Sequence, residues 1–558
     1  MWRFCQALLL VSAIAQAQTA PTGQRAQEEK PAAIRGVVRD QASGNAIEGA
    51  MMALLGGAAD RAQTATDAQG HYAFKDLKPG SYVVSAQVMG QGAHRFLGPR
   101  MEKRVSVRAG QELESCDFRM PTYGKISGKV VDQNGEPMAD VIVALVARVY
   151  SYGTLRHVYS QMGKTDDRGI YTFPSVAPGR SFLIHARKVN YLINPVSEAP
   201  ADPKLRKRAT VPTFYPSSET IEGAAQLLLD PGENREGVDI TMARTPSYCM
   251  ETEIPAEAPE DTRFSLAEAQ PTFGWSDESG LYGMNAGGQI KSNRKLRVCD
   301  LHTGEYELDL MRTSDDAQKP VYYSKTSFSI RDEDVKVPAM TLRGAIQVRG
   351  EIVWDGSAPA EASNVKVSPW LMPMYRPTID QNEIQMEPYP ALVPGALTFP
   401  HLYYDDYTLK ILGVPKPYYV KDIVYGTASI LHAAFHPGSA VGNATLRVVI
   451  GTDGGTLNVQ VQDKGGNPVP DIYVVLIPAE AANEAALAET IISGQTDDQG
   501  AYSRGPVAPG KYYVTTSPAR VPPTPEAMTR LVQARIHAQE VEVGPKASVN
   551  LTLTRKDE

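Results

Sequence analysis

Two segments of the chain place a histidine and a glutamate three residues apart, a spacing that two zinc ligands can have. His302 is followed by Glu305, and His537 is followed by Glu540. A catalytic zinc would need one further protein ligand and an open position for water. The second pair runs into the alternating residues 541–543, which indicate a strand. Residues three apart on a strand face opposite sides, so this pair is not expected to bind one ion.

The other residue types that carry out chemistry form no known arrangement in the sequence. The nine histidines are scattered, and no HExxH, CxxC pair, nucleophile elbow or phosphate-binding loop occurs. Two acidic pairs, Asp166-Asp167 and Asp497-Asp498, offer too few oxygens for calcium, which takes six to eight. We therefore predict plain turns at these pairs, no catalytic residue, no metal and no cofactor.

The acidic pairs belong to an internal repeat. The pattern Thr-Asp-x-x-Gly-x-Tyr begins at Thr66, Thr165 and Thr496, and each time its glycine lies nine residues before the proline of a Pro-Gly pair. The aspartate can bind the backbone two residues on, and glycine takes the positive φ that other residues avoid. Proline presets φ for a second turn, with the glycine after it at the next corner. Alternating residues between and after these turns predict half-buried strands.

Extending this spacing gives two further, weaker copies of the repeat. An apolar marker residue recurs at intervals of 99, 125, 101 and 105 residues, at Leu77, Val176, Leu301, Leu402 and Val507. A tyrosine five residues after the marker is present in four copies. The second copy has Ser181 there and Phe182 one position late, which indicates a bulge or a register change.

The repeat divides the chain into similar units of about 100 residues. A unit of this length with around seven short strands is typical of a β-sandwich, and the 46 glycines and 41 prolines fit many turns. We predict an all-β tandem array of five transthyretin-like or immunoglobulin-like sandwiches. The ranges are 1–17 for a signal peptide, 18–32 for a linker, and 33–121, 122–244, 245–342, 343–453 and 454–558 for the sandwiches.

The clear copies also open alike, with Gly-x-Val-x-Asp at 36–40 and 128–132 and Val-x-Val-x-Asp at 459–463. Together with the later Thr-Asp-x-x-Gly-x-Tyr and Leu-x-Pro-Gly-x-Tyr segments, this frame resembles the regulatory-like domain of carboxypeptidases, a transthyretin-like or Cna-B-like sandwich. The whole chain looks like exported bacterial proteins that string several such units together. The resemblance implies a non-catalytic module linked to carbohydrate binding, cell-surface attachment or an accessory role beside an enzyme.

The start of the chain predicts export. Arg3 precedes a short apolar run at 7–14, and residues 15–17 have the small-x-small pattern of a cleavage site. No later segment is long and apolar enough to cross a bilayer, so we expect no transmembrane anchor after cleavage and a secreted or periplasmic location.

Export would leave three cysteines in a compartment that permits disulfides. Cys249 and Cys299 lie in one repeat, and we predict that they pair. Cys116 has the strand parity of Phe118 and Met120, so we expect a buried, inert thiol.

Aromatic residues are the best sequence evidence for a ligand, because sugars stack on exposed Tyr and Trp faces. The fourth copy concentrates them. The ligand-binding candidates are Trp370, Tyr375, Tyr403, Tyr404, Tyr418 and Tyr419, with Tyr389 and Tyr425 nearby. The alternative is that these rings pack the core of this copy and its joints with its neighbours.

Two insertions interrupt the repeats. Residues 194–207 contain three prolines and end in basic residues, which predicts an exposed, solvated loop. Residues 524–536 predict a short helix with Thr524 as N-cap and with Met528, Leu531 and Val532 on its packing face.

These observations predict a non-catalytic binding or scaffold protein. The expected partner is a polysaccharide or another cell-envelope component, or a protein. The net charge of −7 shows no excess of basic residues for binding nucleic acid, so we expect no nucleic-acid partner. Alternatives are a structural spacer, a protein-interaction rod, or an accessory to a peptidase encoded elsewhere.

Overall fold

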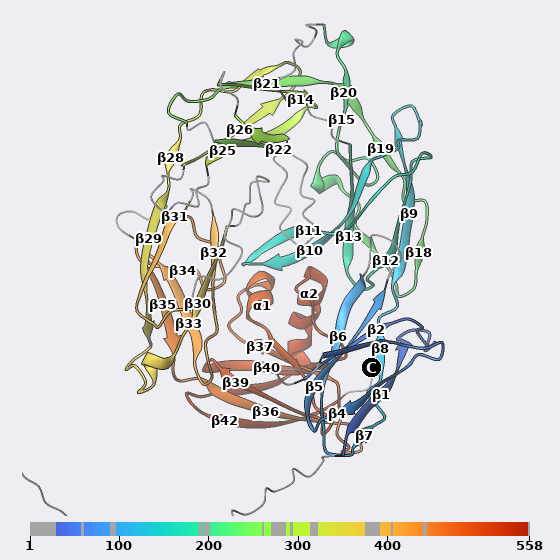
Figure 1. Cartoon of the computed structure of the whole chain (residues 1–558), viewed down its shortest axis with the longest axis vertical. Helices are drawn as coiled ribbons and strands as arrows, with labels where there is room; N and C mark the ends of the chain where they lie inside the picture. The colour runs from blue at the N-terminus through green and yellow to red at the C-terminus, as the bar shows by residue number, and fades with distance from the viewer. Residues whose placement is uncertain are drawn as a thin grey trace, which may run out of the picture.

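The computed structural model describes residues 30–56, 61–89, 96–188, 192–193, 200, 202–258, 262–268, 286–290, 294–312, 322–373, 391–402, 406–438 and 444–555. The predicted signal peptide lies outside these residues. Strands dominate the described chain, and they form pairs of sheets in each predicted range (Figure 1). We call these pairs sandwiches 1 to 5.

In sandwich 1, one sheet has the order β4-β1-β7, with β8 also on β1, and the other has the order β3-β2-β5-β6. The strands are β1 Ala32–Asp40, β2 Met51–Leu55, β3 Arg61–Ala65, β4 His71–Leu77, β5 Gly80–Met89, β6 Phe96–Val107, β7 Glu112–Leu113 and β8 Phe118–Met120.

Sandwich 2 repeats this plan with the orders β12-β9-β18, with β19 also on β9, and β11-β10-β13-β16, with β17 also on β13. Its strands are β9 Gly124–Asp132, β10 Ile142–Ser151, β11 Thr154–Lys164, β12 Ile170–Val176, β13 Ser181–Arg187, β16 Thr213–Phe214, β17 Leu227–Leu228, β18 Asn234–Arg235 and β19 Ile240–Met242. A separate pair, β15 Arg208–Thr210 with β20 Arg244–Pro246, leads to sandwich 3.

Sandwich 3 has the sheets β14-β24-β21-β27 and β23-β22-β25-β26-β28. The strands are β14 Leu192–Ile193, β21 Tyr248–Glu253, β22 Arg263–Glu268, β23 Ala286–Gln289, β24 Lys295–Leu301, β25 Gly304–Arg312, β26 Tyr322–Ile330, β27 Val335–Lys336 and β28 Arg343–Gly344. Strand β14 lies directly before the insertion of sandwich 2 and pairs with β24, so one sandwich extends the sheet of the next.

Sandwich 4 has the sheets β31-β29-β35-β33-β34 and β30-β32, and sandwich 5 has β39-β36-β42 and β38-β37-β40-β41. In sandwich 4 the strands are β29 Ile346–Trp354, β30 Ser368–Pro373, β31 Ala396–Leu402, β32 Tyr407–Leu412, β33 Tyr419–Tyr425, β34 Ala428–Ser429 and β35 Leu446–Gly451. In sandwich 5 the elements are β36 Gly455–Gln462, β37 Tyr473–Pro478, α1 Glu484–Thr490, β38 Ile492–Gln495, β39 Ala501–Val507, β40 Gly510–Ser517, α2 Pro525–Ala534, β41 Gln539–Val543 and β42 Ser548–Thr554.

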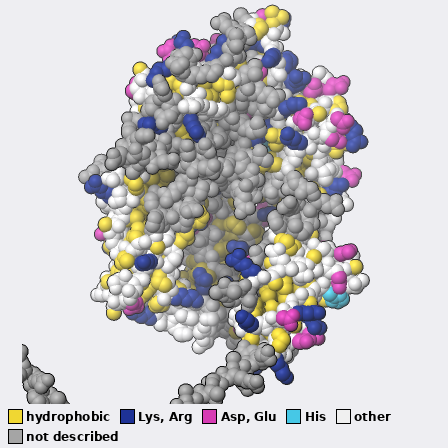
Figure 2. Space-filling model, viewed as in Figure 1, with side chains coloured by type: hydrophobic (Ala, Val, Ile, Leu, Met, Phe, Trp, Pro, Cys, Tyr) yellow, Lys and Arg dark blue, Asp and Glu magenta, His cyan; other side chains and the backbone are white. Residues whose placement is uncertain are grey.

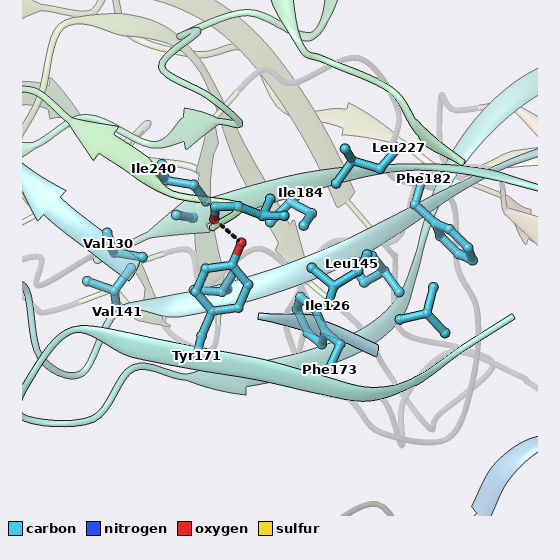
Figure 3. Close-up of a cluster of buried hydrophobic side chains, with 14 of the residues drawn as sticks. Ile126, Val130, Val141, Leu145, Tyr171, Phe173, Phe182, Ile184, Leu227 and Ile240 are labelled. Atoms are coloured by element: carbon cyan, nitrogen blue, oxygen red, sulfur yellow. Dashed lines mark hydrogen bonds between the residues drawn. The ribbon is translucent and has the colours of Figure 1, made fainter. Parts of the chain in front are cut away.

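The five marker residues occupy one equivalent position. Each is buried and is the last residue of a strand, namely β4, β12, β24, β31 and β39. The residue five positions later is also buried in every sandwich and belongs to the opposite sheet. The marker spacing therefore located one crossing between the sheets even in the two divergent copies. A main cluster of buried apolar side chains lies within each of the five predicted ranges, and Figure 3 shows that of sandwich 2.

The Thr-Asp-x-x-Gly segment is the other crossing between the sheets. In sandwich 2 the buried Thr165 hydroxyl donates to the carbonyl of Met138 at 2.6 Å and accepts from the amide of Val141 at 3.0 Å. These bonds tie the end of β11 to the segment that enters β10. Thr66 and Thr496 make the equivalent pairs of bonds in sandwiches 1 and 5.

The glycine of the same segment is required by both its conformation and its surroundings. Gly169 has φ +75°, and a Cβ there would lie 2.6 Å from the carbonyl oxygen of Val130 on β9. Gly70 and Gly500 have φ of +79° and +69°, with the same close approach to Val38 and Val461. The second turn differs from expectation, because only Gly179 of its glycines takes a turn-like positive φ, while Gly80 and Gly510 are the first residues of β5 and β40.

Two tyrosines of the frame have buried hydroxyl partners. The hydroxyl of Tyr171 donates to the carbonyl of Val238 at 2.6 Å, where the last strand of sandwich 2 is split into β18 and β19 (Figure 3). In sandwich 1 the hydroxyl of Tyr72 donates to the carbonyl of Cys116, which lies in the equivalent gap between β7 and β8. The opening glycine of the frame faces the same gap, because a Cβ on Gly128 would lie 1.9 Å from the carbonyl oxygen of Val238.

The bulge or register change predicted near Ser181 is not present. Strand β13 pairs with β10 in continuous register from Phe182 to Arg187, and all its residues are buried. The simple alternation fails because a second small cluster, which includes Leu183 and Phe214, covers the outer face of this sheet. Phe182 packs in the core between the sheets.

The five sandwiches are arranged in a closed ring, with sandwich 5 beside sandwiches 1 and 2 (Figure 1). Lys103 of sandwich 1 forms an ion pair with Asp471 of sandwich 5. Helices α1 and α2 lie near the centre of the ring, below the β10–β11 hairpin of sandwich 2. Lys103 and Asp471 are 368 positions apart in the sequence, yet they belong to neighbouring sandwiches.

We predict that Gly169→Ala destabilises sandwich 2 more than Gly135→Ala. Both glycines have positive φ, so each change costs about 1–2 kcal/mol of backbone strain. Nothing lies within 4 Å of a Cβ at Gly135, whereas at Gly169 the clash with Val130 adds about 1–3 kcal/mol. Hydrogen exchange of β9 and β12 measures the difference, and equal exchange in the two variants would contradict the prediction.

Candidate binding surfaces

Few of the candidate aromatic residues present a free ring on the described surface. Tyr418 is buried, packs against Trp354 at 4.9 Å between ring centroids, and donates its hydroxyl to Glu361. Tyr419 donates to Asp453 at 2.8 Å, near the start of sandwich 5. Trp370 is half-buried on β30. The remaining candidates, Tyr375, Tyr403 and Tyr404, and also Tyr389, lie outside the described residues.

A groove of about 360 Å³ lies between sandwiches 3 and 4. Its size is within the range of small-ligand sites. Its wall is mainly polar, and the polar side chains come from β26, from β28 and the segment before it, and from sandwich 4. They are Ser324, Lys325, Thr326, Thr341, Arg343 and His436. Lys325 pairs with Glu307 at 2.8 Å and His436 with Asp406 at 3.1 Å, so carboxylates share this surface with the basic groups. On the face shown in Figure 2, acidic and basic side chains are interspersed.

The structure separates the two members of the first His-x-x-Glu pair. The register of His302, on the turn that follows the marker Leu301, predicts a surface hairpin. Its ring is instead buried and contacts the carboxylate of Glu268 at 2.9 Å. Glu305 is exposed and pairs with Arg331. The equivalent turns of other copies have lysine or alanine before the Pro-Gly pair, and in sandwich 3 a buried acid on β22 supplies a partner for the histidine.

The environment of His302 shifts its ionisation. Burial favours the neutral ring, but the hydrogen bond and charge of Glu268 outweigh it and raise the pKa of His302. Burial likewise opposes ionisation of Glu268, yet the bond to His302 lowers the pKa of this carboxyl. His185 and Arg187 on β13 of sandwich 2 act on the same carboxylate. Glu268 of sandwich 3 therefore interacts electrostatically with side chains of sandwich 2 as well as with His302.

The second His-x-x-Glu pair also differs from expectation, although again its members are separated. His537 is the last residue of a 3₁₀ turn, Arg535–His537, rather than part of a strand. Glu540 is on β41 and pairs with Lys511. Within the described ranges no three His, Cys, Asp or Glu side chains come together as metal ligands.

The first aspartate of each repeat turn is used by the backbone. The carboxylate of Asp166 accepts the amides of Arg168 and Ile170 at 3.0 and 2.8 Å. Asp67 and Asp497 make the same two bonds in their sandwiches. These carboxylates complete the turns that the sequence predicted.

The cysteines lie as the sequence indicated. Cys249 and Cys299 form a disulfide within sandwich 3. Cys116 is a free, buried thiol, and burial raises its pKa, which keeps it in the unreactive protonated form.

The two insertions make more specific contacts than the sequence suggested. Arg206 does not extend into solvent, because its guanidinium binds Asp334 at 2.5 Å and lies over the ring of Tyr248 on sandwich 3. Helix α2 begins after the predicted cap, Thr524, whose hydroxyl accepts the amide of Ala527. Met528 and Leu531 are buried as expected.

Val532 is the error in the helix prediction. It is 41% exposed, and Ala527 takes the third place on the packing face of α2. The spacing of apolar residues alone placed Val532, instead of Ala527, on the packing face of α2. Sequence reasoning also missed the pairing of His302 with Glu268 and of Arg206 with Asp334. The first pair joins distant segments of one repeat and the second joins two repeats, and the spacing of the repeat encodes neither contact. None of the helices in the described chain is long and apolar enough to span a bilayer.

The fold defines a class, a tandem array of β-sandwiches. The family can be named more closely for its first unit. Residues 33–121 match the carboxypeptidase regulatory-like domain. No curated protein matches the chain.

Several solved structures share local likeness with the chain. The Bacillus anthracis TIE protein is 9% identical with a TM-score of 0.14, over 96% of this chain and 76% of that one. The minor pilin GBS52 of Streptococcus agalactiae is 14% identical with a TM-score of 0.20, over 41% and 99%. The shaft pilin SpaA of Lactobacillus rhamnosus GG is 8% identical with a TM-score of 0.20, over 39% and 98%. TM-scores this low carry no argument about arrangement or role.

We predict that Glu268→Gln lowers the pKa of His302, because the carboxylate that opposes the effect of burial most strongly is then removed. In the unaltered protein the pKa of His302 is raised in the folded state, so protonation of His302 stabilises the fold. This stabilisation is fully present as the pH falls to 6.5, and it is lost as the pH rises through the folded-state pKa of His302. Protonation of Glu268 removes the effect again at low pH, below 4.5.

NMR titration of the histidine rings measures this directly. It is preferable to a pH profile of unfolding, because burial lowers the pKa of His185 to about 3 and gives an opposite pH dependence. Glu305→Gln is the matched control, three residues from His302. A pKa that responds to Glu305→Gln and not to Glu268→Gln would contradict the assignment.

We predict that replacing both Cys249 and Cys299 by serine destabilises sandwich 3. The cysteines are 50 residues apart, and closing a loop of that length restricts the unfolded chain by about 4 kcal/mol in the chain-entropy model. Hydrogen exchange of β21 and β24 is expected to rise while that of β36 stays constant. Unchanged protection of sandwich 3 would refute the prediction.

Proposed function

We propose that the protein is an exported, non-catalytic scaffold. The observation that carries this proposal is the use of the repeat's polar residues: the threonine and the first aspartate of each described Thr-Asp-x-x-Gly segment bind the backbone of their own sandwich. The residues that looked able to bind zinc form pairs with other partners. The signal pattern of the sequence supports export.

The closed ring favours a compact scaffold over the extended spacer or rod that the sequence also allowed. In a rod each sandwich would contact only its neighbours in sequence. Here sandwich 5 contacts sandwich 1 through Lys103 and Asp471, and it contacts sandwich 2 through both of its helices. A scaffold of this form would present loops from several sandwiches to one partner.

Carbohydrate or cell-envelope binding is the second candidate, and the groove between sandwiches 3 and 4 supports it. Hydroxyl groups of Ser324, Thr326 and Thr341 line it beside basic side chains, and such groups can hydrogen-bond sugar hydroxyls and carboxylates. Trp370 on β30 of sandwich 4 offers a half-buried ring.

A glycan and peptidoglycan array on the protein without residues 1–17 tests this second function. We predict binding of an acidic glycan that falls at least tenfold in Thr326→Ala combined with Arg343→Ala. Trp370→Ala reports separately on stacking, and Lys511→Ala on sandwich 5 is the surface control. Binding to no glycan, or equal loss in the control, would exclude the groove as a carbohydrate site and leave the scaffold proposal standing.

A further inference from the structure

Two extensions beyond the repeat plan meet at the centre of the ring. The β10–β11 hairpin of sandwich 2 has strands of 10 and 11 residues, whereas the equivalent β2 and β3 of sandwich 1 have five each. Sandwich 5 carries α1 and α2, the two α-helices of the described chain. Figure 1 shows the hairpin directed at these helices.

The hairpin and the helices are joined by specific polar contacts. Tyr150 donates its hydroxyl to Glu484 of α1 at 2.9 Å and its amide to the carbonyl of Pro523, just before α2, at 2.6 Å. The amide of Tyr152 donates to Glu489 of α1 at 2.5 Å. Tyr150 also packs on the apolar cluster that α1 and α2 share with β37.

The tip of the hairpin reaches sandwich 4 as well. The ammonium group of Lys410 lies 4.9 Å from the centroid of the Tyr152 ring. A Cβ on Gly153 would lie 2.8 Å from the carbonyl oxygen of His432, so the backbones approach closely. Arg156, at the base of this turn, is buried and lies in the field of Glu489. The hairpin thus contacts two sandwiches that lie more than 200 residues further along the chain.

The strained conformation of the hairpin tip indicates that its contacts with other sandwiches have a structural role. Tyr152 and Gly153 form a two-residue turn with φ of +54° and +73°. Such turns strongly favour Asn-Gly, and a tyrosine at positive φ is strained by about 1–2 kcal/mol. Strain of this kind persists where the surrounding structure uses the residue. Here the ring and the amide of Tyr152 both have partners in other sandwiches.

We infer that the β10–β11 hairpin is a latch that closes the chain into a ring by binding the helical face of sandwich 5 in the same molecule. The surface is the face of α1 and α2 around Glu484, Glu489 and the apolar cluster. The inference is independent of any ligand in the groove between sandwiches 3 and 4.

Two variants weaken the latch by different routes. Tyr152→Asn suits the turn better, so it preserves or raises the stability of the hairpin while it removes the ring from Lys410. Glu489→Lys removes the acceptor of the Tyr152 amide and places a second cation near Arg156. Glu542→Lys, on the exposed face of β41, is the control with the same change of charge.

The experiment compares the chain without residues 1–17 and its three variants by small-angle scattering and by zero-length carbodiimide cross-linking. Closure is reported by the cross-link between Lys103 and Asp471, and the Lys325–Glu307 pair within sandwich 3 is the internal standard. We expect Tyr152→Asn and Glu489→Lys to lose the Lys103–Asp471 cross-link and to increase the radius of gyration. Glu542→Lys is expected to retain the wild-type values.

Three results would overturn the inference. A wild-type chain that is extended and lacks the cross-link would show that the ring does not form. Unchanged scattering in both latch variants, with thermal unfolding intact, would show that other contacts close the ring. A cross-link formed between isotopically distinct chains would show that the helical face binds a second copy instead of its own hairpin.

Discussion

In sandwiches 1, 2 and 5, one crossing between the two sheets depends on the hydroxyl of a single buried threonine. Thr165 and its equivalents bind a carbonyl and an amide of the segment that enters the facing strand, and four residues later a glycine passes within contact distance of the first strand of the other sheet. A buried hydroxyl without partners costs free energy, so the bonds specify the crossing more strictly than apolar packing would. The positions of the strands on either side follow from it.

The contacts between sandwiches come from outside this frame. Strand β14 joins the sheet of the next sandwich, Arg206 binds Asp334, and the β10–β11 hairpin reaches sandwiches 4 and 5. This division has a physical reason. The polar groups of the repeat segments bind the backbone of their own sandwich. The features that differ between sandwiches therefore determine how the sandwiches assemble.

The spacing of the repeat predicted the fold but did not predict the contacts of His302 and Arg206, for one reason. The fold rests on local patterns with fixed spacing, and these located the crossings even at Leu301 and Leu402, where little of the frame remains. His302 pairs with a residue on another strand, and Arg206 with one in another sandwich. Such contacts depend on how strands and units come together, which spacing within one repeat does not encode. Val532 shows the same limit, because the edge of a helix face depends on what covers it.

Several aromatic residues of sandwich 4, the unit whose tyrosines and tryptophans suggested a binding face, pack inside that unit. It lacks the Thr-Asp-x-x-Gly segment, and at its other crossing, where β31 leads to β32, the backbone of Tyr407 pairs with that of Phe435 in both directions. The ring of Tyr425 packs on Phe435 at 4.9 Å, and Tyr418 packs on Trp354 at the same separation. These rings therefore pack within the core of sandwich 4. A concentration of Tyr and Trp in a divergent repeat can thus reflect core packing, and a ligand is better sought in the polar groove that sandwich 4 shares with sandwich 3.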